Sequence, residues 1–262
     1  MTNVIVGELK RLYHQYSFNR VYRKYAVHTI IPRDTYIRNL ALARRVHELE
    51  GCIVECGVWR GGMIAGIADI LGDRREYYLF DSFEGLPSAT AIDGRALQAW
   101  QANINAPSYY NNCTAAVAEA ETAMKKSSAT RYSLVKGWFE DTLPDFAPPK
   151  KIALLRLDGD LYKSTVTCLK WLYPLVADEG IVIIDDYWPW DGCARAVHEF
   201  LANIPEGAEV PRIEQYENDV FFMAKRTQNQ ADIVTSYSAG DAASSKTAFF
   251  NGSAAQPSRW GD

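Results

Sequence analysis

The sequence predicts one α/β domain built on a mostly parallel sheet with helices on both faces, and three observations support this prediction. Short apolar segments alternate with helical segments over residues 36–226. The chain has 262 residues, of which 48% are hydrophobic, which is enough for one such domain with a large core. Polar residues follow directly after the main apolar segments, where a parallel sheet presents the carboxyl ends of its strands to a ligand.

The N-terminal residues 1–35 predict a helical arm. Aromatic and basic side chains recur there at loosely helical spacing, and two interpretations stay open: an amphipathic helix packed on the body, or a lid or dimer arm. From Asp34, apolar residues recur at three- and four-residue steps up to Gly51. This spacing predicts a second amphipathic helix that ends at a glycine.

The domain that follows, residues 36–226, carries five apolar segments that predict strands. A long polar stretch between the second and third, residues 88–130, has a helical middle and predicts a lid insertion. Residues 220–224 predict an edge strand. Residues 227–262 are rich in Ser, Ala and Gly without an apolar period, which predicts a disordered tail. The five strands are expected at residues 52–57, 77–81, 132–137, 152–157 and 180–184.

Composition argues against several classes of protein. The net charge of −4 provides no basic stripe for nucleic acid, and no apolar run approaches the ~18 residues of a membrane span. The first residues lack the apolar core of a signal peptide, so we expect a cytoplasmic protein. Five cysteines without a C-x-x-C pair argue against disulfides and a zinc ribbon, and Cys52 and Cys56 are expected as reduced core residues. For His28, a surface or packing role is favoured over a pocket.

A glycine turn follows the first predicted strand, in the motif E-C-G-V-W-R-G-G that starts at Glu55. Glycines at a strand-to-helix turn let a ligand approach the backbone, and the helix N-terminus offers free N–H groups. The motif differs from the G-x-G-x-x-G of dehydrogenases, and its acidic residue suits an amine-bearing ligand. Asp81 ends the next strand about 25 residues later, where an acid can accept hydrogen bonds from ribose hydroxyls. A structural turn and a solvated aspartate are the alternatives.

Four aspartates follow two strands that we expect to be neighbours: Asp158 and Asp160 after one, Asp185 and Asp186 after the other. Carboxylates that close together raise one another's pKa unless a cation lies among them. Hard oxygen ligands favour Mg²⁺, with Mn²⁺ as a substitute. The sequence therefore predicts a metal site at this edge of the sheet.

The same D-x-D pattern also occurs in phosphatases of the haloacid dehalogenase type and in nucleotide-sugar glycosyltransferases. The phosphatases need a Ser/Thr strand end and a Lys between the two acidic pairs, and only 25 residues separate Asp160 from Asp185. The glycosyltransferases leave the upstream glycine turn unexplained. Both classes stay open as less favoured alternatives.

Five motifs taken in order resemble the macrocin O-methyltransferase family: E-C-G-V-W-R-G-G, D-S-F-E-G-L-P, K-G-W-F-E-D-T-L-P, L-R-L-D-G-D-L-Y-K-S-T and I-I-D-D-Y. The resemblance extends over residues 29–226. It implies a Rossmann-like class I methyltransferase fold and an enzyme that methylates hydroxyls on sugars of natural products, using S-adenosylmethionine and a divalent metal. By resemblance alone, the N-terminal arm is also a candidate for forming a homo-oligomer.

The resemblance implies a role for each matched residue. The turn that starts at Glu55 would hold the methionine end of the cofactor, the residues after the second strand its ribose, and those after the third strand its adenine. A cysteine stands at position 56, where the family commonly has threonine. The cofactor residues implied are Thr29, Glu55, Cys56, Gly57, Val58, Trp59, Arg60, Asp81, Ser82, Gly137 and Trp138. The metal ligands implied are Asp158, Asp185 and Asp186, with Asp160 as a contender.

The mechanism we expect is direct methyl transfer to a small-molecule hydroxyl. The metal lowers the pKa of the acceptor hydroxyl, Asp158 takes its proton, and positioning supplies much of the rate. Whether the acceptor is a sugar, a catechol or another hydroxyl compound stays open, because the sequence of the lid that selects it contains no motif that indicates a substrate. A catalytically silent cofactor-binding module is disfavoured by the intact acidic cluster.

Overall fold

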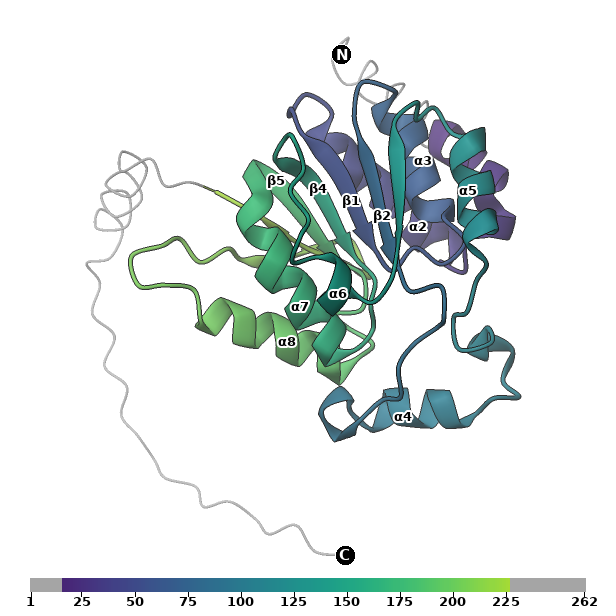
Figure 1. Cartoon of the computed structure of the whole chain (residues 1–262), viewed down its shortest axis with the longest axis vertical. Coiled ribbons are helices and arrows are strands. Elements are labelled where there is room, and N and C mark those ends of the chain that lie inside the picture. Colours follow the sequence, from purple (N-terminus) through teal and green to yellow (C-terminus); the bar gives the residue numbers. More distant parts are fainter. Residues whose placement is uncertain (1–15, 227–262) are drawn as a thin grey trace, which may run out of the picture. The chain divides into compact units, whose positions relative to one another are not determined.

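The computed structural model describes residues 16–226, so the predicted tail and the first 15 residues lie outside the described residues. A seven-stranded sheet forms its centre, with the strand order β3-β2-β1-β4-β5-β7-β6 (Figure 1). The first five strands pair in parallel, and β7 runs antiparallel to β5. The predicted α/β fold with a mostly parallel sheet is therefore confirmed. The strands are β1 (Cys52–Cys56), β2 (Tyr77–Asp81), β3 (Tyr132–Lys136), β4 (Ile152–Leu157), β5 (Val176–Ile184), β6 (Ile213–Tyr216) and β7 (Val220–Ala224).

One strand prediction was wrong. The segment at residues 220–224 is not an edge strand, because it lies between β5 and β6. The edge is β6, whose four residues carry too weak an apolar pattern to be recognised. The antiparallel pairing of β6 and β7 buries Phe222 and Met223 on opposite faces of the sheet.

Helices cover both faces of the sheet, as the alternation of side chains along the buried strands requires. In β5, Ile183 packs into the core on one face and Val182 into the core on the other. The first face carries η1 (Ala26–His28), α2 (Arg33–Ala43), α3 (Gly62–Leu71) and α5 (Val117–Lys126), and the second carries α6 (Phe139–Thr142), α7 (Tyr162–Leu172), η5 (Tyr173–Leu175) and α8 (Asp191–Ala202) (Figure 1). Cys52 and Cys56 are free and buried, as predicted. Among the described residues, no helix is both long and apolar enough to span a membrane.

The helix predicted to end at Gly51 ends earlier. Residues 16–25 are helical, α2 stops at Ala43, and η2 (Arg44–Val46) leads into an irregular turn. The guanidinium of Arg75 donates to the carbonyl oxygens of Val46, His47, Leu49 and Gly51 at 2.6 to 3.1 Å. The carbonyls at the end of η2 and in the turn after it are thus satisfied by a side chain far along the chain, which the local sequence does not reveal.

The stretch of residues 88–130 divides into two parts. Its second part, α5, packs against α3 and buries Ala120, Ala123 and Met124 in the core. Its first part lies beyond the carboxyl ends of the strands (Figure 1). We call residues 86–114 the lid segment; it contains η3 (Ala91–Asp93), α4 (Arg95–Ala102) and η4 (Pro107–Tyr109).

The turn after β1 requires glycine for a reason that can be tested. Gly57 has φ +85°, and a Cβ there would overlap the backbone carbonyl of Asp158. Gly72 has nearly the same φ, +83°, but nothing within 4 Å of an added Cβ. We expect Gly72→Ala to lower the free energy of unfolding by about 1 kcal/mol and Gly57→Ala by about 3 kcal/mol or more. Urea unfolding of both variants measures this, and equal losses would contradict the close approach of β1 and β4.

Candidate functional site

A cavity of about 620 Å³ opens at the carboxyl ends of β1, β2, β4 and β5. This is the switch point of the sheet, because the strand order reverses between β1 and β4. Most of the predicted cofactor residues line it, together with all four aspartates of the acidic motifs. Two do not: Cys56 is buried in the core on the α7 face, and the Arg60 guanidinium lies 3.1 Å from the Glu119 carboxylate. The predicted residues that line the cavity are Thr29, Glu55, Gly57, Val58, Trp59, Asp81, Ser82, Gly137, Trp138, Asp158, Asp160, Asp185 and Asp186.

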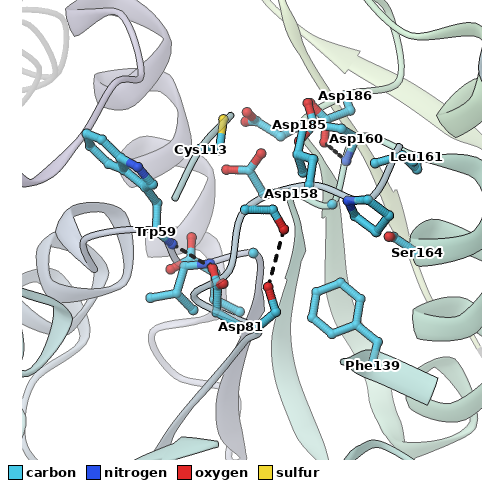
Figure 2. Close-up of a pocket in the computed structure, with 18 of the residues that line it drawn as sticks. Trp59, Asp81, Cys113, Phe139, Asp158, Asp160, Leu161, Ser164, Asp185 and Asp186 are labelled. Atoms are coloured by element: carbon cyan, nitrogen blue, oxygen red, sulfur yellow. Dashed lines mark hydrogen bonds between the residues drawn. The ribbon is translucent and has the colours of Figure 1, made fainter. Parts of the chain in front are cut away.

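Asp81 holds the glycine turn in place. Its Oδ2 accepts hydrogen bonds from the backbone N–H groups of Val58 (2.7 Å) and Trp59 (2.8 Å), and its Oδ1 accepts one from Phe83 (2.6 Å). Burial raises the pKa of Asp81, while these three donors oppose the rise. The end of β2 is therefore fixed against the turn after β1, and Asp81 and the turn line the same cavity (Figure 2).

Arg156 lies at the centre of the site and is 1% exposed. Its Nη1 donates to Glu55 Oε1 (2.8 Å) and Asp158 Oδ2 (2.7 Å), and its Nη2 forms an ion pair with Asp185 Oδ1 (2.5 Å). Arg156 stands within the motif L-R-L-D-G-D, but no role was predicted for it. Its burial could have been predicted, because a charged residue inside the apolar strand I-A-L-L-R-L needs a buried partner. In the structure, β4 pairs Arg156 directly with Glu55 of β1.

Glu55 is also fully buried, and only one of its oxygens is satisfied. Oε2 has no hydrogen-bond partner among residues 16–226. Burial raises the pKa of Glu55 to about 8, in spite of the Arg156 guanidinium beside it. An unsatisfied buried carboxylate oxygen that borders a cavity is suited to accept a hydrogen bond from an amine.

The aspartates gather on the other side of the cavity (Figure 2). Asp158, Asp160 and Asp186 each present an oxygen within 4.8 Å of the others. Asp185 is not part of this group, and one of its oxygens faces Arg156. Burial and the neighbouring carboxylates raise the pKa of Asp160 to about 7 and that of Asp186 well above its ordinary range. Burial likewise raises the pKa of Asp185 to about 6.

Four residues around the cavity were missed by sequence reasoning. Asp93 of the lid segment accepts a hydrogen bond from the N–H of Tyr162 (2.8 Å) at the start of α7, and Cys113 faces the acidic cluster (Figure 2). Trp190 donates to Asp160 Oδ1 (2.7 Å). His28, which was expected at the surface or in packing, lines the cavity and is 8% exposed. No local motif marks any of them, since each reaches the site through tertiary contacts.

The strand order, the antiparallel β7 and an acid at the end of β2 that anchors the glycine turn together define the fold of class I methyltransferases. The family model described as Macrocin-O-methyltransferase (TylF) matches residues 27–220, and the chain belongs to this family. The predicted resemblance is thereby confirmed.

Several known O-methyltransferases are similar to this chain in sequence or in structure. A tetracenomycin-C rhamnosyl 4'-O-methyltransferase of Streptomyces olivaceus is 38% identical over 161 residues, 57% of this chain and 58% of the relative. Demethyldecarbamoylnovobiocin O-methyltransferase of Streptomyces niveus is 36% identical over 64% of this chain and 65% of the relative. The chain thus matches less than two thirds of the length of these relatives. The solved structure of the O-methyltransferase NovP is 29% identical, with a TM-score of 0.61 over 76% of this chain and 83% of that chain.

The raised pKa of Glu55 predicts how its carboxyl affects stability. A group whose pKa rises on folding contributes stability at low pH that is lost as the pH rises through its folded pKa. For Glu55 this window runs from about 4.5 to about 8. Between these two pH values, the free energy of unfolding of wild type should fall as the pH rises. In Glu55→Gln this fall should be smaller than in wild type, by a few kcal/mol over the whole range.

Urea unfolding at a series of pH values measures this difference. Glu121→Gln, at a half-exposed carboxyl on α5, serves as the matched control and should keep the wild-type slope. If the free energy of unfolding depends on pH in the same way in wild type and Glu55→Gln, the raised pKa of Glu55 is contradicted.

Proposed function

We propose that the protein is an S-adenosylmethionine-dependent O-methyltransferase that methylates a hydroxyl of a small molecule, a sugar of a natural product. The observation that carries this proposal is a single cavity with the glycine turn and Asp81 on one side and four aspartates on the other. The family membership and the relatives named for methylating a rhamnosyl tetracenomycin and demethyldecarbamoylnovobiocin support it. A catechol acceptor is the alternative within the same chemistry. Methyl transfer is supported over the glycosyltransferase and phosphatase alternatives by the same family match.

The cavity fits the cofactor at several points. The free Oε2 of Glu55 suits the amine of the methionine moiety, and the absence of a side chain at Gly57 lets a ligand approach the backbone. Asp81 and Ser82 suit the ribose, since both lie at the end of β2 beside the turn. We assign the adenine to the side of Gly137 and Trp138, and closure over the cofactor to Thr29.

The aspartates fit a divalent cation. Buried carboxylates whose pKa values are raised by burial and mutual repulsion are compensated when a cation lies among them. We propose Asp158, Asp185 and Asp186 as the residues that hold Mg²⁺, or Mn²⁺ in its place. Asp185 has one oxygen beside Arg156, which leaves the other for the ion. When bound, the ion supplies Lewis-acid chemistry that lowers the pKa of an acceptor hydroxyl.

We assign the role of proton acceptor to Asp160 rather than to Asp158. Asp158 forms an ion pair with the Arg156 guanidinium, which stabilises its charged form and makes it a weaker base, whereas the side-chain donor to Asp160 is the neutral indole N–H of Trp190. The acceptor is expected under the lid segment, so its proton would leave toward Asp160.

Titration calorimetry with S-adenosylmethionine and S-adenosylhomocysteine, with and without Mg²⁺, tests the proposed function. Micromolar binding of both is expected. Asp185→Asn should lose Mg²⁺ binding and keep the affinity for S-adenosylhomocysteine within about threefold, because the two subsites are separate. No binding of either cofactor form under any condition would overturn the methyltransferase proposal.

Comparison of Asp160→Asn with Asp185→Asn distinguishes the proposed base from the proposed metal ligands. Asp160→Asn should keep Mg²⁺ and cofactor binding but lower the rate of methyl transfer by about 100-fold or more, as expected for the loss of a general base. Calorimetry and a methyl-transfer assay with glycosylated acceptors measure the two effects. If Asp160→Asn loses Mg²⁺ binding while Asp185→Asn retains it, Asp160 and not Asp185 is a metal ligand, and the proposed roles are wrong.

A further inference from the structure

The walls of the cavity carry many acids and few cations. Eight acidic side chains line it, against two side chains with a permanent positive charge, Arg156 and Lys163. His28 is the third basic residue of the lining. Burial and the nearby Lys126 ammonium lower the pKa of His28, so its ring is neutral at pH 7. An anionic ligand therefore meets walls that repel it.

Both cations of the lining are already paired. Arg156 is buried and contacts three carboxylates. Lys163 Nζ lies 2.5 Å from Glu140 Oε1. A diphosphate is normally held by cationic side chains, most often by an arginine fork that matches its oxygens. Among the lining residues within 16–226, no cationic side chain remains unpaired to hold one.

The lid segment adds no cation to the cavity. Residues 86–114 contain two charged side chains, Asp93 and Arg95. Asp93 lines the cavity and is an acid, whereas Arg95 is exposed and is not among the lining residues. A single divalent cation among the four aspartates would compensate two of their four negative charges and leave the region acidic.

Apolar side chains form the remaining walls toward the lid segment. Ile30 and Pro32 line the cavity from the segment between η1 and α2, and Leu86, Pro87 and Ile92 line it from the lid segment. We call these five residues the apolar rim. Pro32, Pro87 and Ile92 are exposed, Ile92 to 38%. Apolar lining with few orienting polar groups is typical of sites that bind the apolar part of a small molecule.

On the lid segment, the apolar rim lies next to the acidic cluster. Ile92 precedes Asp93, whose Oδ1 accepts a hydrogen bond from the backbone N–H of Tyr162 at 2.8 Å. Tyr162 begins α7, two residues after Asp160. This hydrogen bond holds Ile92 beside the loop that carries Asp160.

The N-terminal part of the apolar rim borders the same cluster through α2. Thr35, three residues after Pro32, lines the cavity, and its hydroxyl donates to Asp219 in the turn before β7. β7 pairs with β5 as far as Ile184, and Asp185 follows directly. Both parts of the apolar rim are therefore near the aspartates, where the acceptor hydroxyl is proposed to bind.

We propose that the acceptor is an uncharged molecule in which the sugar is already joined to an apolar group, and that nucleoside diphosphate sugars are excluded. The acidic lining repels a diphosphate, whereas the apolar rim contacts the apolar group. A glycosyl transfer must therefore come before the methylation. This inference rests on the proposed function for the reaction, but the charges and the apolar rim do not depend on it.

The methylation itself is the same for either kind of acceptor. The acceptor oxygen forms a bond to the methyl carbon while the bond between that carbon and the sulfonium sulfur breaks. S-adenosylhomocysteine leaves, and the hydroxyl proton is released. Discrimination between acceptors therefore comes from the group attached to the sugar and not from the bond that forms.

Pairs of acceptors that carry the same sugar test the proposal. A series of hexoses and 6-deoxyhexoses is supplied both as 4-nitrophenyl glycosides and as nucleoside diphosphate esters, and methylation is measured by mass spectrometry. For each sugar that is methylated, kcat/KM of the glycoside should exceed that of the diphosphate ester by roughly 10-fold or more. A smaller ratio, or a preference for the diphosphate ester, would overturn the proposal.

Binding to the protein saturated with S-adenosylhomocysteine tests the proposal without turnover. The probes are the 4-nitrophenyl glycosides, dTDP and UDP, each at about 1 mM, and saturation-transfer NMR detects their contact with the protein. At least one glycoside should bind through its nitrophenyl group, and neither diphosphate should bind. Binding of a diphosphate, or of none of the glycosides, contradicts the proposed acceptor.

Ile92 and Ile104 provide a matched pair of variants on the lid segment. Ile92 lines the cavity, whereas Ile104, 64% exposed, does not. Ile92→Ser should raise KM for a methylated glycoside about 10-fold at unchanged kcat, because apolar contact is lost, and keep the affinity for S-adenosylhomocysteine within about twofold. Ile104→Ser should keep the wild-type values. Equal KM values in the two variants would show that the apolar rim does not contact the acceptor.

Failure of the proposed function gives a different result. Wild type would then neither bind S-adenosylhomocysteine nor methylate any acceptor, whatever group its sugar carries. The binding experiment, repeated on the protein alone, still compares the glycosides with the diphosphates in that case, because it needs no methyl transfer.

Discussion

The burial of one guanidinium among three carboxylates is the interaction on which the rest of the site depends. Arg156 of β4 pairs with Glu55 of β1, with Asp158 just beyond β4 and with Asp185 just beyond β5, so it joins the carboxyl ends of the three central strands. Removing a partner from a buried ion pair typically costs about 3–5 kcal/mol, because the remaining charge stays uncompensated. Arg156 therefore compensates three of the acids that line the cavity.

Arg156 also divides the cavity electrostatically. Glu55 and Asp81 lie toward the glycine turn, where hydrogen-bond donors of the backbone and the guanidinium compensate most of their oxygens. Asp160 and Asp186 lie on the far side, where no cationic side chain is paired with them in the part of the chain that the structure describes. One cavity therefore offers a compensated region beside an uncompensated acidic one.

The position of the lid segment is set by contacts with the elements around the cavity. Asp93 attaches it to the start of α7, and Trp100 rests against Trp190 above the acidic cluster. Residues 110–113 are four consecutive non-glycine residues with positive φ, a conformation that costs roughly 1–2 kcal/mol for each residue. Hydrogen bonds between Asn112 and Leu86 hold this turn in place. A segment under such strain persists only where its neighbours impose the conformation.

The sequence by itself determined the α/β class, the five parallel strands and the position of every acidic motif at a strand end, because these follow from local periodicity and from the rule that parallel sheets bind ligands at one edge. It left out β6, the early end of α2, the carbonyls bound by Arg75, and the partner of Asp185. Only the tertiary structure decided which carboxylates Arg156 neutralises and which stay uncompensated beside Trp190. The reason is that a charge pairs across strands and loops distant in sequence, where desolvation and geometry, and not local pattern, select its partner.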